Sequence, residues 1–161
     1  FLSERKSVPK EKGTKNVRIA IAADHGGFDL KEKIKQYLET NGYSVRDYGT
    51  YNSESVDYPD FAKKVAKSVS NGECERGVLI CRNGIGMTIA ANRFKGVRAA
   101  TCFDVETAKS SRYHDDTNVL GIGADFVDEK KAADIISAWL EMSFDENERR
   151  VRRVNKIDDI P

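Results

Sequence analysis

From Val17 onward, short apolar runs alternate with amphipathic stretches, and this alternation restricts the possible folds more than any other feature of the chain. The apolar runs cover 17–23, 43–47, 77–81, 97–102 and 118–123. Helical patterns follow them, beginning near Phe28, near Pro59, and at 85–94, 105–113 and 129–142. Repeated strand-helix pairs are typical of βα units, whose strands lie parallel in one sheet. The sequence therefore predicts an α/β fold: a three-layer α/β/α domain with a five-stranded parallel, Rossmann-like (flavodoxin-like) sheet.

The chain of 161 residues is long enough for one domain with its own core and short for two. We expect a flexible N-terminal extension at 1–16, one α/β domain at 17–142 and a charged C-terminal tail at 143–161. The tail has an apolar residue at every third position from Val151 to Ile157. Such spacing favours a C-terminal helix whose apolar stripe packs on a partner subunit.

Charge and cysteine content exclude several classes of function. The chain has 27 basic and 26 acidic residues, so no global field attracts it to nucleic acid or to a membrane surface, and a small ligand is expected. No stretch approaches the roughly 18 apolar residues that a membrane-spanning helix needs. The three cysteines show no CxxC spacing, which indicates a reducing, cytoplasmic compartment and no metal site.

Reactive side chains follow two of the predicted strands directly. Asp24 and His25 come after the first strand, and Cys81 ends the third. In an open parallel sheet the ligand binds beyond the carboxyl ends of the strands, where the winding changes direction. If the first and third strands are neighbours there, as in flavodoxin-like order, one crevice contains a carboxylate, an imidazole and a thiol.

The segment Arg82-Asn83-Gly84-Ile85-Gly86 follows the thiol and begins the third helix. Because Gly84 and Gly86 have no side chains, the backbone N–H groups of 82–86 can converge on an anion, as an oxyanion hole or a phosphate cradle. The same amides and the helix dipole predict a lowered pKa for the Cys81 thiol.

A thiolate beside such a loop acts either as a nucleophile or as a base. A cysteine phosphatase needs an arginine six residues after its cysteine, where this chain has Met87. The chain lacks a Walker loop, and Gly121-Ile122-Gly123 lacks the third glycine of a dinucleotide fingerprint, which disfavours nucleotide cofactors. A base facing an oxyanion hole suits proton abstraction next to a carbonyl group, which is the chemistry of aldose-ketose isomerisation.

These residues lie in motifs that together resemble the type B ribose 5-phosphate isomerase and galactose 6-phosphate isomerase family. The motifs are AADHGGFDLKEKI, GTYNSESVDYPDFA, GVLICRNGIGMTIAANRFKGVRAA and RYHDDTNVLGIG, and the resemblance covers about residues 17–158. It implies a sugar phosphate as substrate and a homodimer, or a tetramer, with shared active sites.

The resemblance also implies roles for single residues. Asp24 and His25 contact the sugar and assist ring opening, and Cys81 is the base that moves the proton between C1 and C2. The loop 82–86 stabilises the enediolate. His114 acts as the acid that opens the furanose ring, from a dimer interface where it reaches the partner's site.

Arginines in the charged tail are candidate phosphate ligands. Arg149 and Arg153 are one helical turn apart and would both point at one phosphate. They match the family's phosphate-binding pair if one residue is inserted after Asp145. Arg150 and Arg152 are competing candidates.

Four positions depart from the family pattern, and they cluster at the predicted site. Arg82-Asn83 stand where the family has Gly-Thr, Asp115 stands after His114 in place of Asn, and Asp125 replaces an arginine. One lost cation and two added carboxylates weaken phosphate binding unless Arg82 supplies the missing charge. Arg82, Asn83 and Asp115 are therefore candidate substrate ligands, while Asp115 and Asp125 are equally compatible with lost activity.

The leading hypothesis is interconversion of ribose 5-phosphate and ribulose 5-phosphate through a cis-enediolate, without metal or organic cofactor. A second hypothesis changes the substrate to another aldose phosphate, a tetrose, a hexose or an unusual pentose. A third makes the chain a non-catalytic regulatory module that binds a sugar phosphate. Structural roles stand beside the catalytic ones: Cys81 as a buried strand residue, Asp24 as a helix cap, His25 as a turn residue and His114 as a surface residue.

Overall fold

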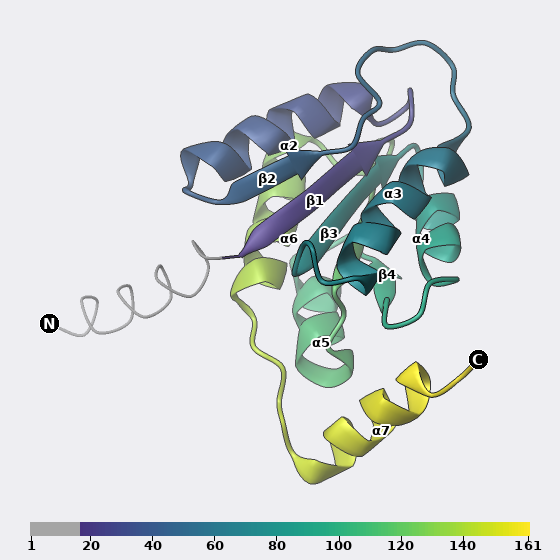
Figure 1. Cartoon of the computed structure of the whole chain (residues 1–161). Helices are drawn as coiled ribbons and strands as arrows, with labels where there is room; N and C mark the ends of the chain where they lie inside the picture. The colour runs from purple at the N-terminus through teal and green to yellow at the C-terminus, as the bar shows by residue number, and fades with distance from the viewer. Residues whose placement is uncertain (1–16) are drawn as a thin grey trace, which may run out of the picture.

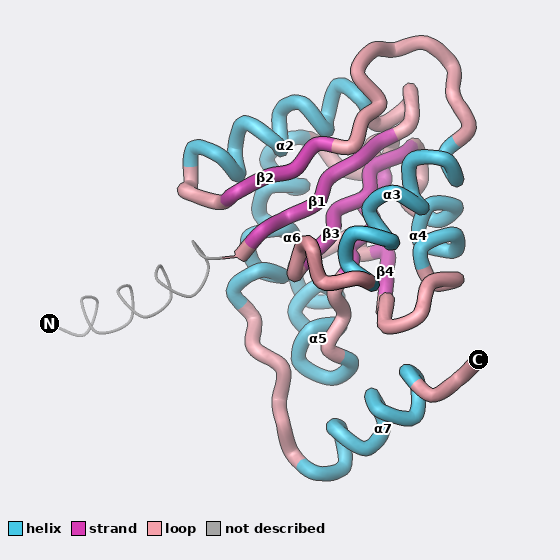
Figure 2. Tube along the Cα trace, viewed as in Figure 1, coloured by secondary structure: helices cyan, strands magenta, loops and turns pink. Residues whose placement is uncertain are grey.

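The computed structural model describes residues 17–161, and the expected N-terminal extension lies outside them. Within this range the chain forms five strands and six helices (Figures 1 and 2). The strands are β1 (Arg18–Ala23), β2 (Ser44–Asp47), β3 (Arg76–Cys81), β4 (Ala99–Thr101) and β5 (Val119–Gly123). The helices are α2 (Phe28–Thr40), α3 (Tyr58–Ser70), α4 (Ile85–Ala91), α5 (Val105–Asp115), α6 (Glu129–Glu141) and α7 (Glu148–Asp158). None of these helices is long and apolar enough to cross a membrane.

The strands form one parallel sheet in the order β2-β1-β3-β5-β4. The predicted five-stranded parallel sheet is confirmed, and β1 and β3 are neighbours as the flavodoxin-like order requires. The last two strands exchange places relative to that order. β5 is buried along its whole length and lies inside the sheet, whereas the three residues of β4 are only half-buried and form the edge.

Alternate residues of β1 belong to two separate cores, because neighbouring side chains of a strand point to opposite faces. Ile19 and Ile21 pack with residues of α2, α5 and α6. Ala20 and Ala22 pack with residues of α3 and α4. Figure 1 shows the helices on the two sides of the sheet, and the predicted three-layer arrangement is confirmed.

Three elements differ from the sequence prediction by two or more residues. α4 ends at Ala91, short of the predicted 94, because the side-chain amide of Asn92 forms two hydrogen bonds with the backbone of Ala99, at 2.8 and 2.9 Å. The two bonds close the turn into β4, which shortens to three residues. α5 extends two residues beyond the predicted end and stops at Asp116, whose left-handed backbone (φ 49°) cannot continue a helix.

The predicted C-terminal helix is present as α7, which lies apart from the layers (Figure 1). Its main helical neighbour is α5. Arg98, just before β4, donates from Nη1 to the Asp158 carboxylate at 2.9 Å, and Val154 is buried. Ile157 remains 45% exposed, so packing of this helix on a partner subunit stays a prediction.

Candidate functional site

The ends of β1 and β3 lie side by side and bring the first group of candidate residues together. Ala23 is in register with Ile80, and the N–H of Asp24 donates to the carbonyl oxygen of Ile80 at 3.3 Å. Asp24 and Cys81 therefore lie together at the carboxyl ends of these two strands. The winding changes direction there, because β1 leads to β2 on one side while β3 leads to β4 on the other.

Asp24 organises the turn between β1 and α2. Its Oδ1 accepts hydrogen bonds from the N–H groups of Gly26 at 2.9 Å and Gly27 at 3.1 Å, and the residue is 7% exposed. Gly27 lies so close to β3 that an added Cβ would stand 2.2 Å from the carbonyl oxygen of Ile80. One carboxylate oxygen thus has a structural role, and the other accepts no hydrogen bond from residues 17–161.

His25 points toward the long loop between β2 and α3. Its Nδ1 accepts a hydrogen bond from the N–H of Val56 at 3.2 Å. A nitrogen that accepts a hydrogen bond carries no proton, so the neutral imidazole has its proton on Nε2. His25 consequently presents an N–H donor, and the β2–α3 loop fixes that orientation.

A buried ion pair anchors the same loop at its start. Lys31 of α2 has no exposed surface, and its Nζ lies 2.6 Å from Oδ2 of Asp47, the last residue of β2. Tyr51 donates from its hydroxyl to the carbonyl oxygen of Asp47 at 3.0 Å. Burial opposes the charge of Asp47, but hydrogen bonds from Lys31 and from the Gly49 amide outweigh it and lower the pKa of this carboxyl. Sequence patterns alone do not mark Lys31, because it falls among the polar residues of an amphipathic helix.

Cys81 is 5% exposed, and its surroundings contradict one expectation. Sγ accepts a hydrogen bond from the N–H of Gly84 at 3.2 Å, and the amides of Met87 and Asn83 also favour the thiolate. Burial outweighs these amides and raises the pKa of the Cys81 thiol, and the charge of Asp24 adds to the rise. The predicted lowering of this pKa is therefore wrong, because desolvation at the end of a buried strand destabilises the anion more than the loop amides stabilise it.

The amides of the loop after Cys81 do not all point at one place. The Gly84 amide donates to the thiol, and the Ile85 amide donates to Oδ1 of Asn83 at 2.9 Å. The Gly86 amide has no acceptor among residues 17–161. Of the segment expected to form an anion site, at least two amides are thus engaged within the loop, and that of Gly86 is available to a ligand.

Tyr58, which the sequence did not single out, lies against this loop. Its ring covers Gly86 so closely that an added Cβ there would be 2.6 Å from Cε1 of Tyr58. Tyr58 is the first residue of α3 and is 41% exposed. The sequence marks Tyr58 only by its place beside Pro59, where a helix is predicted to begin, and within the motif GTYNSESVDYPDFA.

Two of the unusual residues meet at the opening of this site. Nη1 of Arg82 lies 3.8 Å from Oδ1 of Asp125, and both side chains are more than half exposed. The stem of Arg82 lies over the β1–α2 turn, because an added Cβ on Gly26 would come within 2.6 Å of its Cγ. Arg82 therefore reaches from the end of β3 across the turn after β1 to Asp125, two residues after β5.

The remaining candidates lie at the opposite end of the sheet, near the amino ends of the strands. His114 is in the last turn of α5, which runs back along the sheet to the amino ends of the strands. Just beyond it, the carbonyl oxygen of Asp116 accepts from Nε of Arg98, and Arg98 immediately precedes β4. Within one chain His114 is thus separated from Cys81 by the length of the sheet, and α7 lies on the same side as His114 (Figure 1).

The candidate phosphate ligands of α7 differ in their surroundings. Arg150 is engaged, because it pairs with Asp145 and its Nε donates to Nδ1 of His114 at 3.0 Å. Arg149, Arg152 and Arg153 are exposed, and none of them forms a hydrogen bond or ion pair with any residue in 17–161. The helix therefore leaves available the two arginines that spacing selected, and also Arg152, one of their two competitors.

Asp115 is exposed and lines a cleft of about 670 Å³ at this end of the sheet. The other walls come from the turn between α4 and β4 and from the end of α7, residues 157–161. Cys81 and Asp24 do not line it. The cleft is accordingly separate from the group at the ends of β1 and β3.

Comparison with known families decides the class of this site. The family model described as Ribose/Galactose Isomerase matches residues 19–157. The chain belongs to the ribose/galactose isomerase family. Membership confirms the expected reaction class, an aldose-ketose isomerase of sugar phosphates.

Relatives of this isomerase carry more than one substrate name. Ribose-5-phosphate isomerase B of Escherichia coli K12 is 44% identical over 140 residues, 87% of this chain and 93% of the relative. D-erythrulose-4-phosphate isomerase of Pectobacterium atrosepticum is 40% identical over 129 residues, 79% and 84% of the two chains. The crystal structure of a ribose 5-phosphate isomerase of Thermotoga maritima matches with a TM-score of 0.87 at 46% identity, over 90% of this chain and 99% of that one.

The raised pKa of the Cys81 thiol can be tested by alkylation. The rate of its reaction with iodoacetamide should reach half its limit at a pH above the value of about 8.5 typical of a free thiol. Asp24→Asn should shift that midpoint to lower pH, because the amide keeps an oxygen acceptor for the turn but removes the negative charge. Mass spectrometry of peptides separates Cys81 from Cys74 and Cys102.

Asp125→Asn is the matched control, since it removes a carboxylate at the same end of the sheet that is not among the main causes of the raised thiol pKa. It should leave the midpoint unchanged. A wild-type midpoint at or below that of a free thiol would contradict the dominance of burial.

Proposed function

We propose that this isomerase interconverts ribose 5-phosphate and ribulose 5-phosphate through a cis-enediolate, with Cys81 as the base. The position of the Cys81 sulfur carries the proposal. Cys81 is the last residue of β3, and its sulfur accepts a hydrogen bond from the Gly84 amide. Asp24 and His25 follow the neighbouring strand β1 at the same end of the sheet. The three cysteines of the chain are free and buried, which supports a reducing compartment such as the cytoplasm.

In the proposed reaction, the Cys81 thiolate takes the proton from C2 of the open-chain aldose. The electron pair moves into the C1–C2 bond, and the former carbonyl oxygen becomes the enediolate oxygen, which the Gly86 amide is available to stabilise. The O2 proton passes to O1, and the thiol returns its proton to C1 to give the ketose. No oxidant or reductant is needed.

Ring opening precedes that step, because a pentose phosphate in solution is mostly cyclic. It requires an acceptor for the proton of the anomeric hydroxyl and a donor to the ring oxygen. Asp24 has a carboxylate oxygen that the turn does not use, and His25, the next residue, presents Nε2–H. We assign the donor to His114 of a second copy.

Cys81→Ala tests the base directly. Removing a general base should lower kcat for ribose 5-phosphate isomerisation by on the order of a hundredfold or more, with KM little changed. Cys102→Ala is the matched control: it also removes a buried thiol of raised pKa, but from the core between α5 and α6, and should retain activity. Full activity of the Cys81 variant would overturn the mechanism. Wild-type turnover that this variant loses would exclude a purely regulatory module.

A shorter sugar phosphate is the second candidate substrate, and Arg82 is the observation that favours it. Its stem occupies the space over Gly26 at the opening of the site, and Asp125 holds its end. A long side chain in that place reduces the length available to a substrate. One relative is named for a four-carbon substrate, D-erythrulose 4-phosphate.

A panel of tetrose, pentose and hexose phosphates separates the two candidates by kcat/KM. If Arg82 limits substrate length, Arg82→Gly should raise the preference for pentose over tetrose by about tenfold or more. An effect of that size is usual when a pocket gains or loses the space for one methylene group. Arg82→Lys, which keeps the charge and most of the length, should leave the ratio nearly unchanged. Equal ratios in the wild type and the glycine variant would remove Arg82 as a determinant of length.

We propose that two copies of the chain share their sites. Cys81 lies at the carboxyl ends of the strands and His114 at their amino ends, so a single copy does not bring them together. Arg149 and Arg153 are exposed on a helix that packs mainly on α5, and they are available to a neighbour's substrate. Together these positions support a homodimer, or a tetramer made of such dimers.

Mixing two inactive variants tests the sharing. If each site takes Cys81 from one copy and His114 from the other, Cys81→Ala and His114→Ala should each be nearly inactive. An equal mixture should regain about a quarter of the wild-type activity, because half of the dimers are mixed and each has one intact site. A mixture of Cys81→Ala with Cys81→Ser should stay inactive. A monomer in light scattering at micromolar concentration, or no recovery on mixing, would contradict sharing.

A further inference from the structure

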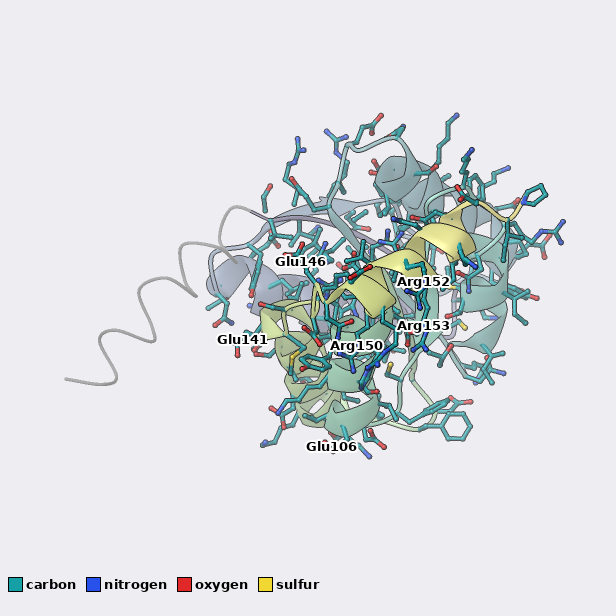
Figure 3. All side chains as sticks on the ribbon, turned by 90° about the horizontal axis from the view of Figure 1, so that it is seen from below. Glu106, Glu141, Glu146, Arg150, Arg152 and Arg153 are labelled. Carbon is teal, nitrogen blue, oxygen red and sulfur yellow. The ribbon has the colours of Figure 1, made fainter. Side chains whose placement is uncertain are left out.

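Arg150 of α7 makes three contacts around the histidine at the end of α5. Its Nε donates to Nδ1 of His114 at 3.0 Å, and its guanidinium pairs with Asp145. The same group lies 4.9 Å from the ring centre of Tyr113, a cation–π contact. Figure 3 looks onto α7 from below and shows Arg150 where this helix passes the end of α5.

The local backbone fixes Arg150 in this place. Asn147 caps α7 through its side chain: Oδ1 accepts from the Arg150 amide at 3.0 Å, and Nδ2 donates to Asp145 at 2.9 Å. The amide of Asp145 in turn donates to the carbonyl oxygen of Tyr113 at 3.1 Å. The Arg150 side chain is only 17% exposed. The guanidinium is therefore held by both helices and by the segment that joins α6 to α7.

This contact dictates where His114 carries its proton. A guanidinium is always protonated and has only donors, so the nitrogen that faces it must offer a lone pair. Nδ1 is that nitrogen, and the proton of the neutral imidazole is consequently on Nε2. The opposite tautomer would place two N–H groups against each other.

We propose that Arg150 is a positioning residue that holds His114 in the Nε2–H tautomer, so that a donor and not an acceptor faces the substrate. The functional part of this inference rests on the proposed role of His114 toward the ring oxygen of the sugar. A ring oxygen has only lone pairs, and an unprotonated Nε2 would repel it. Arg150 acts through His114 and is assigned no contact with the sugar.

The tautomer is measured by long-range ¹H–¹⁵N NMR on uniformly ¹⁵N-labelled protein, at a pH where the spectrum itself shows neutral imidazoles. The chain has two histidines, so the spectrum contains two imidazole patterns. His114 should show an unprotonated Nδ1 and a protonated Nε2. His25 is an internal reference, because its Nδ1 also accepts a hydrogen bond, from the Val56 amide.

Arg150→Ala should convert the His114 pattern into a mixture of tautomers and leave the His25 pattern unchanged, which also reports that the fold is intact. Arg150→Lys retains a donor and should restore the Nε2–H form at least in part. Arg152→Ala removes an exposed arginine of the same helix and should change neither pattern. A wild-type His114 protonated on Nδ1, or an unaltered His114 pattern in Arg150→Ala, would overturn the proposal.

Kinetics of the same variants test the functional part. With a sugar phosphate added in its cyclic form, Arg150→Ala should lower kcat roughly tenfold to a hundredfold with little change in KM, since misorientation of one catalytic group has effects of that size. Arg150→Lys should recover part of the loss. An unchanged kcat in Arg150→Ala, despite an altered tautomer, would overturn the functional part. Absence of wild-type turnover would instead contradict the proposed reaction, and the tautomer result would stand by itself.

Discussion

Main-chain hydrogen bonds where β1 and β3 end hold Asp24, His25 and Cys81 in place. The backbone ladder continues past the ends of the strands. The Asp24 amide donates a hydrogen bond to the carbonyl oxygen of Ile80, and the Thr50 amide donates one to that of Ala23 at 2.8 Å. The turn after β1, the thiol at the end of β3 and the β2–α3 loop are thereby joined by backbone contacts. Because such contacts do not depend on side-chain identity, the frame persists while the side chains on it change.

The Cys81 thiol is subject to two opposing effects that arise from the same position. Ending a fully buried strand removes the sulfur from water, while beginning a glycine loop surrounds it with N–H groups. Burial prevails, so the group is mostly a thiol at neutral pH, and its less abundant thiolate is a stronger base than an ordinary one. In the mechanism proposed above, the protein would thus use a base that is scarce at neutral pH but intrinsically strong.

Much of the fold could be predicted from the sequence, because apolar runs of strand length and helical periodicity are local signals. The meeting of Asp24 with Cys81 followed from topology alone, since neighbouring parallel strands end at one edge. The direction of the thiol pKa could not be predicted, because a glycine-rich motif is visible in the sequence while the depth of burial is not.

Contacts between distant segments were equally inaccessible to sequence reasoning. Arg82 and Asp125 were recognised separately as unusual, but their contact depends on how the ends of β3 and β5 are placed. Arg150 was one of several arginines with similar spacing, and only the packing of α7 on α5 distinguishes it. The spacing of Arg149 and Arg153 remains a prediction for the same reason, because their ligand would come from outside the chain.

The close approach of backbone segments around the thiol also limits how this protein can diverge. An added Cβ would stand 2.8 Å from a backbone atom at both Gly84 and Gly123, so almost any mutation there disturbs the main chain. The side chains of Arg82, Asn83 and Asp125, in contrast, are exposed at the same edge. We therefore expect substitutions that preserve the fold to concentrate at these exposed positions. If their side chains contact the sugar as proposed, the sugar preference can change there while the isomerase scaffold stays intact.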